Sequence, residues 1–213
     1  MAVEVRRHQF GSGQGKIVLL TARDGLAAQV GHDLTIEVSR WSAELEVADD
    51  LSAADLFVRA DLNSLVVRAG TGGVMPLTDR DRREIAVTAR KVMRVDRHPE
   101  ATFSAQGLKP DQDGDGAITG TLTIAGVSRP LTLDVTRTGQ DSYHATASVR
   151  QSDFGLKPYT AFLGALKVSD AVRIAVDVEL PPGVLGNGAG GQAGDGAGGR
   201  AGGRADDGAG GQP

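Results

Sequence analysis

Hydrophobic and polar residues alternate along most of the chain up to Leu180, with the two-residue period that places successive β-strand side chains on opposite faces. The clearest case is a pair of runs, residues 117–124 and 131–136, in which leucine, isoleucine and valine occupy one phase and threonine mostly the other. Only the short stretch Gly126–Pro130 separates them. A connection of this length suits an antiparallel hairpin, because a parallel pair needs a far longer crossover. The pattern therefore predicts an antiparallel sheet that covers a core on one face.

A change of phase interrupts one long extended run. The apolar residues of 34–38 share one phase, whereas those of 41–47 share the opposite one, so we expect a bulge or tight bend near Ser39–Arg40. About eight alternating segments are present in all. They fit a two-sheet sandwich or a barrel closed on itself, and the long bent strands favour the closed eight-strand barrel. Such a barrel is either filled by its own side chains or holds one small ligand.

One segment, Thr78–Val95, has a helical period instead. Ile85, Ala89 and Val92 form a narrow apolar stripe, with Thr78 placed to cap the start of the helix. We expect a single amphipathic helix lying on one edge or mouth of the sheet, with its charged residues facing solvent.

The remaining segments suggest a domain plan of a flexible lead over residues 1–15, a barrel domain over 16–182 and a tail over 183–213. The lead is polar and glycine-rich, and the tail is made almost entirely of glycine and alanine with a few polar residues. A tail of this kind has little to bury and large chain entropy, so we expect it to be disordered. Within the domain, Ser152–Lys167 is apolar without a clear period, which predicts a loop resting on an apolar surface.

Composition excludes several classes of function. The chain has 213 residues, no cysteine and a net charge of −4 with both signs scattered, so it has no disulfide, no thiolate metal site and no basic footprint for nucleic acid. Its four histidines lack metal-ligand spacing, and we expect neither a metal nor a cofactor. No run approaches the roughly 18 apolar residues of a membrane span. Met1–Lys16 contains no apolar run, so we expect no signal peptide and a cytoplasmic protein.

Four blocks, in order, resemble the YceI-like family: His98–Phe103, Gly120–Asp134, Asp153–Gly155 and Val168–Leu180. The second block, with its Gly-x-Leu-Thr-Ile-x-Gly-Val-x-Arg-Pro motif, is the most specific. The resemblance implies a lipocalin-like antiparallel barrel with a helix. It also implies a long hydrophobic cavity that binds a polyisoprenoid chain, such as an isoprenoid quinone or a related amphiphile.

This resemblance and the inward phase of the strands predict a set of ligand-binding residues. At the mouth we expect the side chains of the apolar loop: Phe154, Tyr159, Phe162 and Leu163. Along the wall we expect inward residues of the strands: Phe103, Leu122, Leu133 and Val135. Tyr159 can donate a hydrogen bond to a head group, and His32, in a Gly-His-Asp turn near a barrel end, can contact it. The alternative for each of these residues is that it simply packs the core.

Three hypotheses of function follow. The first is non-catalytic binding or carriage of a hydrophobic, isoprenoid or quinone-like small molecule, for which a ten-carbon chain offers about 8 kcal/mol at about 0.8 kcal/mol per buried methylene. The second is a filled barrel with a structural or interaction role, with a homodimer as one arrangement. The third is an enzyme acting on a lipid-like substrate. The third is the weakest, because no serine or histidine stands in a recognisable catalytic setting.

Overall fold

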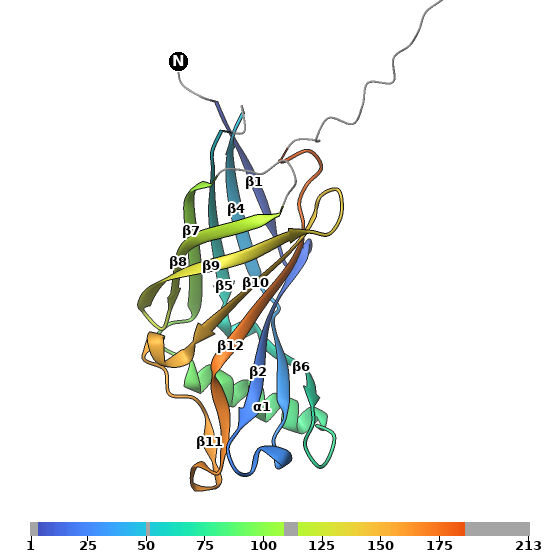
Figure 1. Cartoon of the computed structure of the whole chain (residues 1–213), viewed down its shortest axis with the longest axis vertical. Coiled ribbons are helices and arrows are strands. Elements are labelled where there is room, and N and C mark those ends of the chain that lie inside the picture. The colour runs from blue at the N-terminus through green and yellow to red at the C-terminus, as the bar shows by residue number, and fades with distance from the viewer. Residues whose placement is uncertain (1–3, 50–51, 109–114, 186–213) are drawn as a thin grey trace, which may run out of the picture.

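The computed structural model describes residues 4–49, 52–108 and 115–185. It contains one antiparallel sheet and one α-helix, α1 (Asp79–Val92), shown in Figure 1. The strands are β1 (Val5–Gly11), β2 (Gly15–Asp24), β3 (Asp33–Val38), β4 (Trp41–Ala48), β5 (Ala54–Asp61), β6 (Leu65–Thr71), β7 (Glu100–Leu108), β8 (Gly116–Ile124), β9 (Val127–Arg137), β10 (Ser142–Arg150), β11 (Thr160–Ala161) and β12 (Leu166–Glu179). Short 3-10 turns interrupt the chain at Ala28–Val30, Leu62–Ser64, Gln151–Phe154 and Phe162–Gly164.

The sheet is strongly curled but open. Its strand order is β1-β4-β5-β7-β8-β9-β10-β12-β2-β3-β6, with β11 paired to β12 off this path. Within the described residues no ladder joins the two end strands, β1 and β6. The mainly β, antiparallel prediction is confirmed, but the closed barrel of about eight strands is wrong. The count differs because two long runs of the chain are each divided between opposite ends of the sheet, and because β1 and β11 are strands that the alternation did not predict.

Those divisions occur where the sequence changes phase. The chain bends at Ser39–Arg40, and β3 pairs with β2 and β6 while β4 pairs with β1 and β5. The run from β5 to β6 bends likewise through Leu62–Ser64. Hydrogen bonds tie the two bends together: the Arg40 amide donates to Ser64 Oγ at 2.9 Å, and the Ser39 amide donates to the Ser64 carbonyl at 3.2 Å. At the predicted bend the main chain therefore passes directly from one end of the curled sheet to the other.

Two seams of the sheet are only partly paired. β7 and β8 form a ladder over just Thr102–Ser104 and Thr121–Thr123, and β9 and β10 pair only near Thr136 and His144. Beyond these short ladders the neighbouring strands diverge, as Figure 1 shows for β7 and β8. The sheet therefore wraps around an interior without making a complete cylinder.

Both ends of the domain extend beyond the predicted boundaries. The expected flexible lead of residues 1–15 instead contains β1, which pairs with β4 over seven residues. Cross-strand ion pairs between Arg7 of β1 and Glu44 and Glu46 of β4 supplement the backbone ladder. At the other end, Val184 is buried in a hydrophobic cluster that includes Leu45, although we expected it to belong to the tail. The rest of that tail, residues 186–213, lies outside the described residues.

Helix α1 begins and ends close to its predicted limits. The Thr78 Oγ1 accepts a hydrogen bond from the Asp81 amide at 3.2 Å, and the Asp81 carboxylate accepts one from the Thr78 amide at 2.8 Å. This reciprocal capping box fixes the start of the helix. The helix lies across one end of the sheet next to β6 (Figure 1), which confirms the predicted position.

Candidate functional site

A cavity of about 700 Å³ lies between α1 and the end of the sheet that the helix crosses. We call it the mouth cavity. Apolar side chains of β2, β3, β12 and α1 form most of its wall, including Leu19, Leu34, Ile36, Ile85, Ala89, Val92 and Ile174. The predicted helical stripe of Ile85, Ala89 and Val92 therefore faces this cavity. Exposed Val74 and Met75 also line it, so the cavity reaches solvent between the surrounding loops.

A second cavity of about 310 Å³ continues further along the interior, away from the helix. We call it the inner cavity. Its wall is more uniformly apolar and is supplied by β4, β5, β7, β8, β9, β10 and β12, including Trp41, Leu56, Phe103, Leu122, Leu133, Val176 and Val178. The two cavities share Leu19, Met93, Ile124 and Ile174. The two cavities adjoin at these four side chains, which we call the constriction, so the interior is hollow along two chambers in series.

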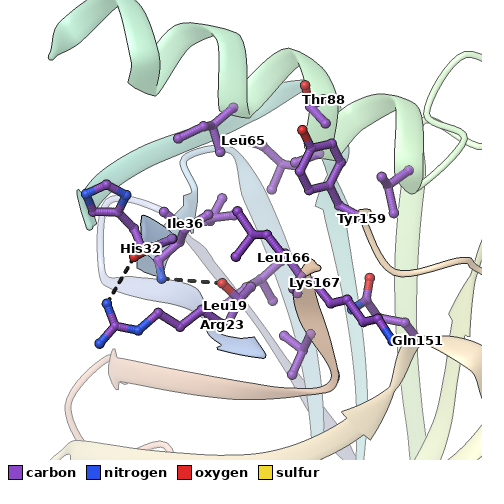
Figure 2. A pocket seen from close by; sticks show the side chains of 18 of the residues that line it. Leu19, Arg23, His32, Ile36, Leu65, Thr88, Gln151, Tyr159, Leu166 and Lys167 are labelled. Carbon is purple, nitrogen blue, oxygen red and sulfur yellow. Dashed lines mark hydrogen bonds between the residues drawn. The ribbon is translucent and has the colours of Figure 1, made fainter. Parts of the chain in front are cut away.

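Polar side chains stand on opposite sides of the mouth cavity. Figure 2 shows Arg23 and His32 on one side and Tyr159, Lys167 and Gln151 on the other. The Gln151 side chain is already hydrogen-bonded within the protein, because its Nε2 donates to the Ser169 carbonyl at 2.9 Å. Within the described part of the chain, Tyr159 and Lys167 have no side-chain hydrogen-bond or ion-pair partner. They are the mouth groups most available to a bound polar head.

Arg23 and His32 are engaged by the protein instead. Arg23 donates from Nη1 to the Gly31 carbonyl at 3.0 Å, and His32 Nε2 bonds the Met75 carbonyl at 2.8 Å. Both side chains pack against the loop that leads into α1, where a Cβ on Gly72 or Gly73 would stand within 2.6 Å of the Arg23 or His32 side chain. Both glycines also have positive φ, of 75° and 73°, which strains any other residue type except asparagine or aspartate. The histidine therefore pins this loop to the sheet.

Two titrating groups beside the cavities have displaced pKa values. Hydrogen bonds from the side chain and backbone of Thr78 lower the pKa of the Asp81 carboxyl, which lines the mouth cavity. Burial raises the pKa of the Tyr143 hydroxyl, which lines the inner cavity. The first keeps a negative charge at the helix start, and the second keeps the phenol neutral in an apolar setting.

The predicted site residues are distributed between the two cavities. Phe103, Leu122, Leu133 and Val135 line the inner cavity, and His32, Phe154 and Tyr159 line the mouth cavity. Phe162 and Leu163, predicted at the mouth, line neither cavity and are strongly exposed. The turn at 162–164 has positive φ at all three residues, so it directs these two side chains away from the interior.

Sequence reasoning missed part of the site. The segment Val74–Leu77 borders the mouth cavity, and its apolar run between a glycine pair and a helix cap was the available signal. Met93 at the constriction and Trp41 in the inner cavity were also missed. Trp41 is the sole tryptophan of the chain, and its buried indole Nε1 has no hydrogen-bond partner among the described residues.

The described residues contain neither a group of metal ligands nor a long apolar helix. No group of three or more His, Asp or Glu side chains within residues 4–49, 52–108 and 115–185 is arranged to hold a metal ion. None of the helices in these ranges has the length and apolar character needed to cross a bilayer.

Comparison with known proteins identifies the fold family. A YceI-like domain matches residues 18–180. The chain belongs to the YceI-like family. The resemblance carried by the four sequence blocks is thereby confirmed, and the fold of this family is consistent with hydrophobic-ligand binding.

Individual YceI-like relatives are distant. The UPF0312 protein of Pectobacterium atrosepticum is 30% identical over 109 residues, covering 47% of this chain and 55% of that protein, and the UPF0312 protein of an Enterobacter species is 30% identical over 111 residues. The chain thus spans about half the length of the curated relatives it matches. Among solved structures, Burkholderia cenocepacia BcnA has a TM-score of 0.55 at 16% identity, covering 83% of this chain and 98% of that chain. A Campylobacter jejuni YCEI protein has a TM-score of 0.47 at 22% identity, covering 68% and 82%. The likeness to BcnA supports the fold alone.

Proposed function

We propose that this chain binds or carries, without catalysis, a hydrophobic ligand of the isoprenoid or quinone type in its two cavities. The observation that carries the proposal is the arrangement of two apolar chambers in series, of about 700 and 310 Å³. Small-molecule sites usually measure about 300–1,000 Å³. An interior of this size favours binding over the alternative of a filled barrel with a purely structural role.

The distribution of polar groups gives the ligand an orientation. The polar head lies in the mouth cavity, where Tyr159 and Lys167 are free to bond it. The apolar chain passes Met93 at the constriction and continues into the inner cavity. This orientation buries the chain where water is excluded and leaves the head close to solvent, as an amphiphile requires.

Binding alone accounts for the site. The family fold is generally one of binding proteins, and an apolar chain supplies about 0.8 kcal/mol for each methylene that it buries. An enzyme acting on such a ligand remains the weaker alternative, since no grouping of the mouth residues resembles a nucleophile with its base. The cytoplasmic location also stays a prediction, which cell fractionation tests.

Trp41 allows a direct experiment. Because it is the sole tryptophan and lines the inner cavity, an isoprenoid alcohol whose chain reaches that cavity should change the fluorescence emission of Trp41 with saturation. The matched control is a short-chain alcohol with the same head group, which should bind weakly and leave the emission of Trp41 unchanged. Mass spectrometry of a solvent extract of the purified protein should in addition reveal a stoichiometric apolar compound. Absence of both a saturable emission change and an extracted compound would contradict the proposal.

A further inference from the structure

Exposed apolar side chains gather around the opening of the mouth cavity. Among the described residues, ten large hydrophobic side chains are exposed, and seven of them lie on three loops: Leu26, Val30, Val74, Met75, Tyr159, Phe162 and Leu163. We define the rim as these three loops, residues 25–32, 71–78 and 156–168. Single exposed apolar residues are ordinary on a protein surface, but a cluster of them marks an interaction site.

The three loops form one surface. The Ala27 amide donates to the Ala165 carbonyl at 2.9 Å, which joins the first loop to the third. His32 Nε2 bonds the Met75 carbonyl at 2.8 Å, which joins the first loop to the second. Figure 1 shows these loops together at the end of the molecule crossed by α1. The apolar tips are therefore presented side by side around the cavity opening.

The third loop holds its tip residues outward at a conformational cost. Phe162 and Leu163 have φ values of 49° and 54°, in the left-handed region that residues other than glycine and asparagine rarely adopt. Leu163 is fully exposed and Phe162 is 68% exposed. Packing inside the protein does not account for a strained turn that displays two large apolar side chains to solvent, and strain of this kind tends to gather at functional sites.

Charge on the rim indicates what it contacts. The chain contains 27 Asp and Glu residues, and none falls in the rim, which carries Lys157 and Lys167. Neither lysine has an ion-pair partner in the described part of the chain. The nearest carboxylates along the chain, Asp24, Asp33, Asp79 and Asp170, lie just outside the loops. A symmetric contact between two copies would bring these lysines towards one another, whereas lipid phosphates would complement them.

We propose that the rim docks on the surface of a lipid bilayer, inserting the tips of its three loops among the lipids while its lysines contact anionic head groups. The cavity opening then faces the hydrocarbon interior, so an apolar ligand enters or leaves without crossing water. Docking of the rim is independent of the ligand proposed above, and only its purpose rests on that proposal.

The test is flotation of the full chain with vesicles of phosphatidylcholine, with and without phosphatidylglycerol. We expect binding that increases with the anionic lipid and weakens in high salt. The double variant Phe162→Asn/Leu163→Asn removes the apolar tips, and asparagine tolerates the left-handed backbone. We expect its partition to vesicles to fall about tenfold or more, since two large side chains no longer enter the bilayer. Lys157→Gln/Lys167→Gln should remove the dependence on anionic lipid.

Phe57→Ser and Val87→Ser are the matched controls, because both residues are exposed but lie outside the rim. Each should float like the unaltered chain. Failure of the unaltered chain to bind either vesicle, or equal binding by the double variant, would overturn the proposal. If instead the double variant changed only the oligomeric state measured by light scattering, the rim would be an interface between copies and the membrane proposal would be wrong. Fluorescence of Trp41 with ligand, measured without vesicles, separately tests the ligand proposal.

Discussion

The constriction between the two cavities allows a sharp test of how a ligand lies in the interior. Met93 follows α1 directly and lines both chambers. Methionine is flexible and can move aside for a chain, whereas a phenylalanine ring at the same position would be larger and stiffer. Free volume on both sides of residue 93 gives the ring space, so we expect Met93→Phe to fold normally while closing the passage.

The expected loss of affinity in Met93→Phe can be worked out from the volumes of the two cavities. The inner cavity of about 310 Å³ supplies roughly three tenths of the free space, against about 700 Å³ for the mouth cavity. If ten chain carbons contribute about 8 kcal/mol, excluding the chain from the inner cavity removes about 2.4 kcal/mol, an increase in Kd of about 50-fold. A short isoprenoid that fits in the mouth cavity should lose little affinity.

The assay compares short-chain and long-chain isoprenoid alcohols by titration, read by calorimetry and by the fluorescence emission of Trp41. Met93→Leu, which nearly conserves volume, is the control and should behave like the unaltered chain. Met93→Phe should weaken the long-chain alcohol selectively and abolish the change that it causes in Trp41 emission. Unchanged long-chain affinity and an unchanged emission response in Met93→Phe would show that the chain does not pass the constriction, and the orientation proposed for the ligand would be wrong.

Three further predictions concern stability. Thr78→Ala should lower the free energy of unfolding by about 1 kcal/mol in urea denaturation, because it removes the helix cap, and Thr78→Ser should retain it. Because the pKa of Asp81 is lowered in the folded state, ionised Asp81 stabilises the folded protein above the unfolded carboxyl pKa, and this stabilisation is lost as pH falls through the folded pKa. Thr78→Ala should flatten this part of the plot of unfolding free energy against pH. An unchanged plot would show that Thr78 does not lower the pKa of Asp81. Ser64→Ala leaves the Arg40 amide without its 2.9 Å acceptor and should cost about 1–3 kcal/mol, measured in the same way; a cost near zero would show that the bonded bends do not hold the sheet ends. Phe154→Ala, at a buried position beside the mouth, should cost about 3–5 kcal/mol, and a loss below 1 kcal/mol would indicate that the site collapses around the smaller side chain.

Period and phase in the sequence predicted the local structure well. The bend at Ser39–Arg40 and the helix capped by Thr78 both occur where the pattern indicated. Alternation says which face a side chain occupies but not which strand lies beside it. The division of strands between opposite ends of the sheet depends on contacts between distant residues, so the closed eight-strand barrel was a reasonable but wrong assembly of correctly predicted pieces.

The polar strand β1 and the exposed apolar side chains of the rim have a common physical explanation. Strand β1 is mostly polar because it is an edge strand whose outward side chains are solvated, and its stability comes from the ladder and ion pairs to β4. Phe162 and Leu163 are apolar, yet the left-handed turn directs them outward. Hydrophobicity predicts the burial of a side chain only where the backbone conformation and the neighbouring strands permit it. Neither of these can be read from the local sequence.

The sequence also contains a signal for the hollow interior, but it can be recognised only once the inward-facing residues of each strand are known. Several inward positions around the inner cavity are alanine, among them Ala43 in β4, Ala60 in β5, Ala101 in β7 and Ala145 in β10. Other inward-facing positions of these strands carry larger side chains, such as Leu56, so the strands can accommodate large residues in the interior. A curled sheet whose inward phase alternates large side chains with alanine encloses more space than its side chains fill, since packed cores normally leave few voids. The alanines therefore explain physically why the interior stays open, and they favour a protein that holds a guest over one that only maintains its own fold.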